Sequence, residues 1–184
     1  MAEAASVLAG ARYEGFVSVA EAGLHGMVTL RGNLASDAVA RALRGAVDLG
    51  VPGQRQVLSE GGRAVAWMSP DELMIMVPYA EAEGVAAKLA EALAAEFATV
   101  ANVSDARAVF TVSGAALDDA LAKLCPVDFA TLAPGMIRRT RAAQVAVALW
   151  RSGQGEVTLV CFRSVAAYVF GLLRNAAAPG GELR

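Results

Sequence analysis

The chain contains one supersecondary unit twice, as LRGNLASDAVARALR (30–44) and as VSGAALDDALAKLCP (112–126). Each copy contains the end of a β-like run, a turn of small residues, an aspartate and then a helix with an apolar stripe. Gly32 and Gly114 occupy the same place in the two copies, where a glycine is free to adopt a positive φ. The two stretches therefore align at an offset of 82 residues.

The alignment continues beyond the quoted stretches. Asp37 falls on Asp119 without a gap, and the Pro-Gly pair at 52–53 falls on the pair at 134–135. A repeat of this length indicates duplication of a supersecondary unit, so the two copies are expected to build similar folds.

Alternating apolar residues, turn residues and helical stripes give each copy the order strand, helix, two or three strands, helix. The expected strands are 26–31, about 54–59, 63–68 and 73–77 in the first copy, and 107–112, 136–141, 145–150 and 156–161 in the second. The closing helices are expected near 80–97 and 164–176.

The helices of the first copy have clear signals. Ser36 is placed to cap the first helix. Each helix then shows a stripe that would face a sheet. The stripes are Val39, Leu43 and Val47 in the first helix, and Val85, Leu89, Leu93 and Phe97 in the second.

This order predicts an α+β fold of two pseudo-repeated, ferredoxin-like β-α-β-β-β-α units with mostly antiparallel sheets. Each copy is small for independent stability, so we expect a single domain over 1–184, with pseudo-repeats at about 24–103 and 104–178. The ends, 1–12 and 178–184, are expected to fray.

Charge is divided unevenly along the chain. Residues 1–98 carry 7 basic and 12 acidic side chains, a net −5, whereas residues 99–184 carry 9 and 6, a net +3. Arginine is favoured at protein interfaces, so this excess predicts a docking patch for an acidic partner surface. Two other interpretations are a solvated strand face and internal pairing with Asp119, Asp128 or Glu156. The candidate docking residues are Arg139, Arg141, Arg151 and Arg163.

The sequence offers no self-contained catalytic constellation, so we predict no catalytic, cofactor-binding or metal-binding residues in this chain. Ser104 and Asp105 lack a neighbouring base, and the single histidine, His25, has no cluster around it. No phosphate-binding glycine loop follows a strand. The net charge of −2 and the lack of an aromatic stacking set also argue against nucleic acid as a partner.

Cellular location is inferred from three features. Cys125 and Cys161 lie in apolar surroundings and form no disulfide framework. No apolar stretch reaches the roughly 20 residues of a membrane helix. The opening MAEAASVLAGARYEG lacks the basic start of a signal peptide. We therefore expect a cytoplasmic protein without a membrane partner.

Several motifs carry a resemblance to a known family. The specific pieces are LAKLCPVDF (121–129), RRTR (138–141), LWR (149–151) and FRSVAAY (162–168), with LRGN, LGVP and WMSPDELMIMVP in the first half. Over about residues 24–176 the chain resembles the gamma subunit of heterotetrameric sarcosine oxidase. The N-methylglutamate dehydrogenase complexes contain a similar subunit. The wider fold group includes the folate-binding aminomethyltransferase of the glycine cleavage system, whose opening motif is echoed by SDARAVFTVSG (104–114).

The resemblance implies a duplicated ferredoxin-like core like the folate domain of the aminomethyltransferase. It also implies a non-catalytic accessory role in a heterotetramer with alpha, beta and delta subunits. That complex converts sarcosine to glycine, with formaldehyde (or methylenetetrahydrofolate) and hydrogen peroxide as further products. FAD, FMN, NAD and tetrahydrofolate are expected in the partner subunits and none in this chain.

The sequence departs from the aminomethyltransferase pattern after its second Pro-Gly pair. Those enzymes carry an asparagine and an aspartate at the folate site, whereas MIRRTRAAQVAVALW (136–150) contains neither. Three alternatives remain open from sequence: a gamma-like subunit of N-methylglutamate dehydrogenase, a stand-alone folate-dependent one-carbon transfer protein, and a generic regulatory or small-molecule-binding domain.

Overall fold

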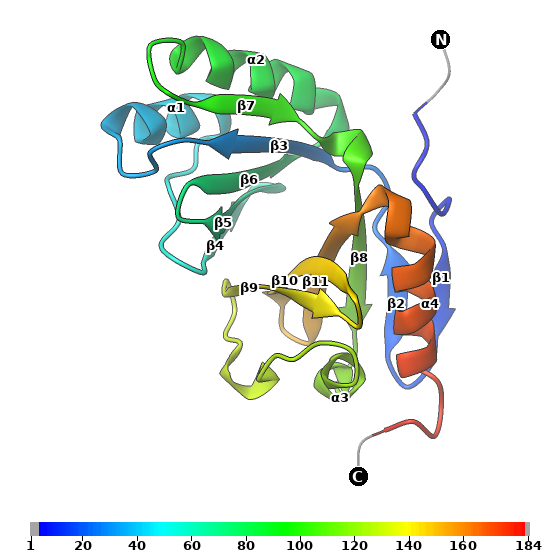
Figure 1. Cartoon of the computed structure of the whole chain (residues 1–184). Coiled ribbons are helices and arrows are strands. Elements are labelled where there is room, and N and C mark those ends of the chain that lie inside the picture. Colours follow the sequence, from blue (N-terminus) through cyan, green and yellow to red (C-terminus); the bar gives the residue numbers. More distant parts are fainter. Residues whose placement is uncertain (1–3, 183–184) are drawn as a thin grey trace. The chain divides into compact units, whose positions relative to one another are not determined.

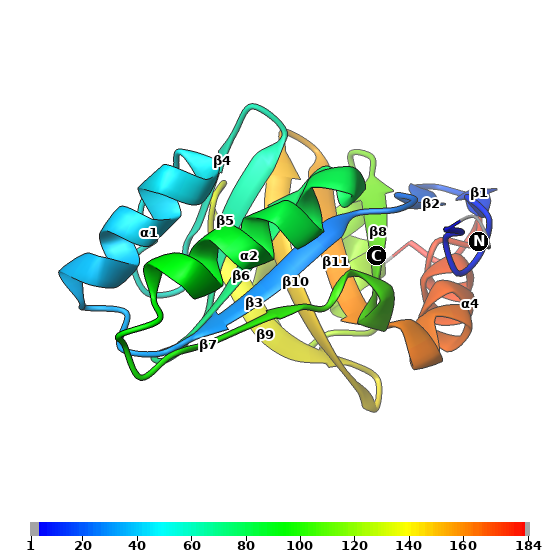
Figure 2. The same ribbon diagram turned by 90° about the horizontal axis from the view of Figure 1, so that it is seen from above.

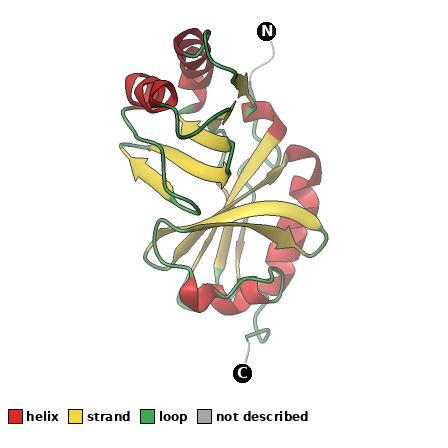
Figure 3. Cartoon of the chain, turned by 60° about the vertical axis from the view of Figure 1, so that its left-hand side comes forward, coloured by secondary structure: helices red, strands yellow, loops and turns green. Residues whose placement is uncertain are grey.

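Two antiparallel sheets organise the chain in the computed structural model, which describes residues 4–182. One sheet belongs to a continuous unit, residues 25–104, and the other to a discontinuous unit, residues 4–24 with 105–182. Helices cover one face of each sheet (Figures 1 and 3). The predicted α+β class of two ferredoxin-like, antiparallel units is confirmed. The single domain over 1–184 stays a prediction.

The continuous unit contains sheet B, with strand order β4-β5-β6-β3-β7. Its core lies between this sheet and two helices, and every residue of the central strand β6 is buried. The strands are β3 (Gly26–Arg31), β4 (Val57–Glu60), β5 (Arg63–Ser69), β6 (Glu72–Val77) and β7 (Thr99–Asn102). The helices are α1 (Asp37–Val47) and α2 (Ala82–Ala92), which is preceded by the 3₁₀ turn η1 (Tyr79–Glu81).

Helix α1 follows its sequence signals closely. The Ser36 side chain accepts a hydrogen bond from the backbone N–H of Ala38 at 3.1 Å, so it caps the helix as predicted. The predicted stripe is buried, and Asp48 ends the helix in a left-handed conformation with φ of 60°. An amphipathic helix with a defined start and stop thus covers sheet B.

Helix α2 ends earlier than predicted. It begins at Ala82 and stops at Ala92, and irregular turns then lead the chain into β7. The predicted stripe is buried as far as Leu93, but the prediction is wrong for Phe97, whose side chain is fully exposed at 102%. The helical periodicity cannot extend to Phe97, because the chain must reverse to place β7 beside β3.

The discontinuous unit contains sheet A, with strand order β1-β2-β8-β11-β10-β9. Its strands are β1 (Arg12–Glu14), β2 (Ser18–Glu21), β8 (Arg107–Ser113), β9 (Ile137–Ala142), β10 (Val145–Gly153) and β11 (Glu156–Phe162). Its helices are α3 (Leu117–Ala122) and α4 (Ala166–Ala176), with 3₁₀ turns η3 (Phe129–Thr131) and η4 (Arg163–Val165). Phe110, Leu121, Leu149 and Leu159 are fully buried in its core.

Four strands correspond in order between the sheets, β4-β5-β6-β3 in sheet B and β9-β10-β11-β8 in sheet A, but the position next to β3 and β8 is filled differently. In sheet B the strand beside β3 is β7, which follows α2 in the chain. In sheet A the equivalent strand beside β8 is β2, which comes from the N-terminal segment. The second repeat is therefore completed by residues that precede the first.

Glu21 holds residues 6–10 of the N-terminal segment, which corrects the expectation of fraying for this stretch, whereas residues 1–3 lie outside the described part of the chain. The Glu21 carboxylate is buried, with 4% of the residue exposed. It accepts hydrogen bonds from Ser6 Oγ at 3.0 Å, from the Leu8 N–H at 3.0 Å and from the Gly10 N–H at 2.7 Å. One carboxylate thus holds the turn that precedes β1.

Glu21→Ala is expected to release this turn, because two backbone N–H groups and one hydroxyl lose a charged acceptor. We expect a loss of about 2 kcal/mol of unfolding free energy. Amide hydrogen exchange should show reduced protection at Leu8 and Gly10. The exposed Glu91→Ala serves as the control, and unchanged protection in Glu21→Ala would contradict the role of this carboxylate.

Candidate functional site

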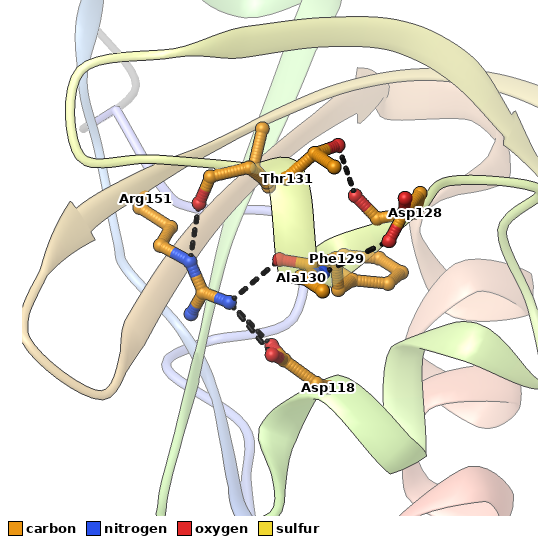
Figure 4. A network of polar contacts seen from close by, with 7 residues as sticks. Asp118, Asp128, Phe129, Ala130, Thr131 and Arg151 are labelled. Atoms are coloured by element: carbon orange, nitrogen blue, oxygen red, sulfur yellow. Dashed lines mark hydrogen bonds and ion pairs between the residues drawn. The ribbon is translucent and has the colours of Figure 1, made fainter.

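Arg151 lies on β10, and its side chain points into the loop that connects α3 with β9 (Figure 4). The Arg151 side chain is only 17% exposed. Its Nε donates a hydrogen bond to the backbone oxygen of Leu132 at 2.6 Å, and its Nη2 donates to the backbone oxygen of Phe129 at 3.1 Å. These contacts satisfy backbone acceptors at the start of η3 and directly after its end.

Asp118 completes this network from the first turn of α3. Both of its carboxylate oxygens lie within reach of Arg151 Nη2, at 2.8 and 2.7 Å. The same loop is also fixed by Asp128, whose carboxylate accepts from the Ala130 N–H at 3.1 Å and whose backbone oxygen accepts from Thr131 Oγ1 at 2.9 Å. Arg151 therefore has an internal ionic partner. That partner is Asp118, not one of the three acids (Asp119, Asp128 and Glu156) that the sequence offered for internal pairing.

Arg139 and Arg141 lie on β9, the edge strand of sheet A. Both are exposed and share one face of the strand, as the alternation of a β-strand requires. Arg141 Nη2 also donates to the backbone oxygen of Gln144 at 3.3 Å. Charged side chains on an edge strand hinder uncontrolled strand pairing while leaving the edge accessible to a specific partner.

Arg163 lies elsewhere in the unit, at the first residue of η4, directly after β11. Its Nη2 donates to the backbone oxygen of Ala5 at 3.1 Å. Next to it, the guanidinium of Arg107 lies 4.0 Å from the centre of the half-exposed Phe162 ring. The strand register places Arg151 and Arg163 toward opposite ends of the sheet, so the four predicted arginines do not form one cluster.

The continuous unit carries a groove that the sequence analysis missed. It lies between α1 and α2 and has a volume of about 360 Å³. Its two charged lining residues are Arg41 and Lys88, and the others are alanine or glycine, among them Ala38, Gly45 and Ala92. The available signal was the small residues of α1 around Arg41, and Ala92 one helical turn after Lys88 on α2.

Other reactive groups are few in the part of the chain that the structure describes. Residues 4–182 contain no cluster of three or more His, Cys, Asp or Glu side chains placed to hold a metal ion. The same residues include no helix with the length and apolar character needed to cross a membrane. Cys125 and Cys161 are both free thiols buried in the core of the discontinuous unit.

Burial raises the pKa of both thiols to about 11, from an ordinary value of 9.0, because the thiolate loses hydration. We expect native alkylation by iodoacetamide at pH 8 to be about 100-fold slower than in the denatured chain, since the thiolate is the reactive form. The two thiols ionise at lower pH in the unfolded chain than in the folded chain. Their contribution to the free energy of unfolding should therefore decline as pH rises from about 9 to 11. Equal native and denatured alkylation rates would contradict this environment.

The sequence comparisons identify a family. Residues 31–179 match the family described as sarcosine oxidase, gamma subunit. The chain is 37% identical over 117 residues to "Sarcosine oxidase subunit gamma" of Arthrobacter sp., and 38% identical over 117 residues to the protein of that name from Corynebacterium sp. (strain P-1). Each match covers 61% of this chain and 57% of the relative, so the matched region spans less than two thirds of these relatives' length.

Solved structures show the same likeness. A chain of "Heterotetrameric Sarcosine Oxidase from Corynebacterium sp. U-96 in complex with pyrrole 2-carboxylate" superimposes with a TM-score of 0.80 at 27% identity, covering 88% of this chain and 83% of that one. Aminomethyltransferase T of the glycine cleavage system from Bartonella henselae matches with a TM-score of 0.62 at 15% identity, covering 81% and 43%. That second likeness concerns the fold alone.

The family match covers both units, including the Arg151 network and the arginines of β9. The duplicated fold agrees with that assignment, since it is shared with a chain of a sarcosine oxidase structure. The protein described here belongs to the sarcosine oxidase gamma subunit family.

Proposed function

We propose that this chain is the accessory gamma subunit of a heterotetrameric sarcosine oxidase complex and has no catalytic role of its own. The observation that carries the proposal is the superposition with a chain of a heterotetrameric sarcosine oxidase, which extends over 88% of this chain. The partner subunits would convert sarcosine to glycine, formaldehyde and hydrogen peroxide. The proposal also places the complex in the cytoplasm.

The proposal assigns the redox chemistry to alpha, beta and delta partner subunits. FAD, FMN, NAD and tetrahydrofolate would be bound there and not by this chain. The contacts of Arg151 fit an accessory role, because its donors are directed to Asp118 and to the backbone of one loop. These contacts explain the position of the Arg151 side chain within the unit without a bound substrate.

Within this proposal the predicted docking residues divide into two kinds. Arg139 and Arg141 present exposed guanidinium groups on an edge strand, which suits contact with an acidic partner surface. Arg163 and Arg151 hold neighbouring backbone segments through hydrogen bonds. The latter two would support the docking surface by fixing its shape.

Reversing the exposed charges in Arg139→Glu/Arg141→Glu is expected to weaken recovery of the larger subunits about tenfold, because repulsion replaces attraction across the interface. The measurement is co-purification at fixed ionic strength. The matched control is Arg174→Glu, which changes an exposed arginine on α4. Equal recovery of all three proteins would overturn the assignment of docking to β9.

The whole proposal is tested by recovering the tagged chain from its native cells and recording the absorption spectrum of the eluate. We expect flavin bands, larger subunits identified by mass spectrometry, and peroxide release that depends on sarcosine. Activity with N-methylglutamate in place of sarcosine would instead indicate the other complex. A colourless chain recovered alone would contradict the accessory role.

A further inference from the structure

We infer that the groove between α1 and α2 is a second docking surface, and that its occupant is an amphipathic helix of a larger subunit carrying carboxylate side chains. This inference rests on the proposed function, because it needs the complex to supply the partner. The two helices lie side by side over sheet B (Figure 2), and the groove runs between them with a volume of about 360 Å³.

The first argument is the shape of the groove. Apart from two bases, its lining is alanine and glycine, including Ala38 and Gly45 from α1 and Ala92 from α2. Side chains this small allow a third helix to approach at the short end of the usual 8–10 Å between helix axes. An amphipathic helix placed with its apolar face in such a groove is a common form of recognition.

The second argument is charge. Arg41 and Lys88 line the groove, and no carboxylate does. Within residues 4–182 neither base has an ion-pair partner. A neutral partner that covered them would remove two cations from water without compensation, whereas aspartate or glutamate on the partner would pair with them. Charge complementarity therefore selects an acidic helix.

The third argument is Phe97, which lies at one end of the same helix pair. Its side chain is fully exposed, and its backbone oxygen lies 3.4 Å from the position that a Cβ on Gly32 would occupy. Gly32 leads into α1, and Ala92 is the last residue of α2, so Phe97 lies at the end of the helix pair where α1 begins and α2 ends, outside the residues that line the groove. An isolated exposed phenylalanine in this place offers the partner helix an apolar contact beyond the alanines.

A zero-length carbodiimide crosslink gives a direct test in the intact complex, because the chain contains only two lysines, Lys88 and Lys123. The reagent joins a lysine amine to a carboxylate in contact with it. We expect a link from Lys88 to an aspartate or glutamate on a helix of a larger subunit, identified by mass spectrometry. Lys123 is the internal control, since its Nζ donates to the backbone oxygens of Ala176 and Gly181 and lies 4.9 Å from the Phe16 ring.

Variants complete the test. Arg41→Glu/Lys88→Glu should reduce recovery of the larger subunits about tenfold. The matched control Arg44→Glu, which reverses an exposed charge on α1 outside the groove, should leave recovery unchanged. Lys88→Gln, a milder change, should remove the crosslink while circular dichroism remains that of the parent chain.

Each outcome is decisive. If the parent chain recovers the larger subunits but Lys88 links to none of them, and the double reversal recovers them equally well, the groove inference is wrong and the proposed function stands. A link from Lys88 to a second copy of this chain would also overturn the choice of occupant. If the parent chain recovers no larger subunit, the proposed function fails and the inference falls with it.

Discussion

Gly15→Ala is expected to destabilise the discontinuous unit by about 3 kcal/mol, the upper end of the usual cost of overpacking. A Cβ on Gly15 would lie 1.8 Å from the backbone oxygen of Ala177 and 2.8 Å from its carbonyl carbon. Both are backbone atoms, so no side-chain rotation relieves the overlap. The neighbouring Phe16 N–H also donates to the Ala177 oxygen at 3.0 Å, and the displacement would break this bond.

The measurement is urea-induced unfolding of both proteins, followed by circular dichroism. Gly171→Ala is the matched control, because Gly171 lies inside α4 and an added Cβ there meets no atom within 4 Å. That substitution should stabilise the chain by up to about 1 kcal/mol, since alanine favours a helix over glycine. Equal stability of Gly15→Ala and the parent chain would contradict the close contact between the β1–β2 turn and the end of α4.

Arg151→Met is expected to cost about 2 kcal/mol of unfolding free energy, because three backbone or carboxylate acceptors lose a charged donor. Asp118 is 43% exposed and can recover water, which keeps the loss below that of a fully buried ion pair. The backbone oxygens of Phe129 and Leu132 lie in and directly after η3, in the connection between α3 and β9. The loss should therefore appear first as faster hydrogen exchange across residues 128–132.

A double-mutant cycle with Asp118→Asn isolates the ion pair from the remaining contacts. We expect the sum of the two single losses of unfolding free energy to exceed the loss in the double variant, because each single change removes the same interaction. The exposed Arg141→Met is the control and should change stability by no more than about 0.5 kcal/mol. If the losses of unfolding free energy from Arg151→Met and Asp118→Asn simply add, the contacts between Arg151 and Asp118 contribute no coupling energy.

The periodic parts of the fold were predictable from sequence because their signals are local. The strand expected at 26–31 is β3, and the Ser36 cap and stripe of α1 are present as predicted. The missed strands β1, β2 and β7 have three or four residues each, which is too short for alternation to be distinctive. The pairing of β2 with β8 also depends on residues far apart in the sequence.

The candidate sites were harder to foresee because they depend on packing. The charge excess located arginines 139 and 141 correctly on a strand, but no local pattern shows that Arg151 turns toward Asp118. Phe97 continues a helical stripe in sequence, yet the chain leaves the helix before reaching it. The α1–α2 groove likewise arises only when two alanine-rich helices are placed side by side.

The origin of β2 has a consequence for synthesis on the ribosome. Val19 pairs with Val112, so the first strands of the nascent chain must wait for residues made 93 positions later. At translation rates of 5–20 residues per second this delay is roughly 5 to 20 seconds. During that interval residues 25–104 emerge with all the strands of sheet B, whereas β1 and β2 can pair only with each other until β8 is made. Strand β2 is thus made before sheet B, yet it meets β8 only after the strands of sheet B have been made.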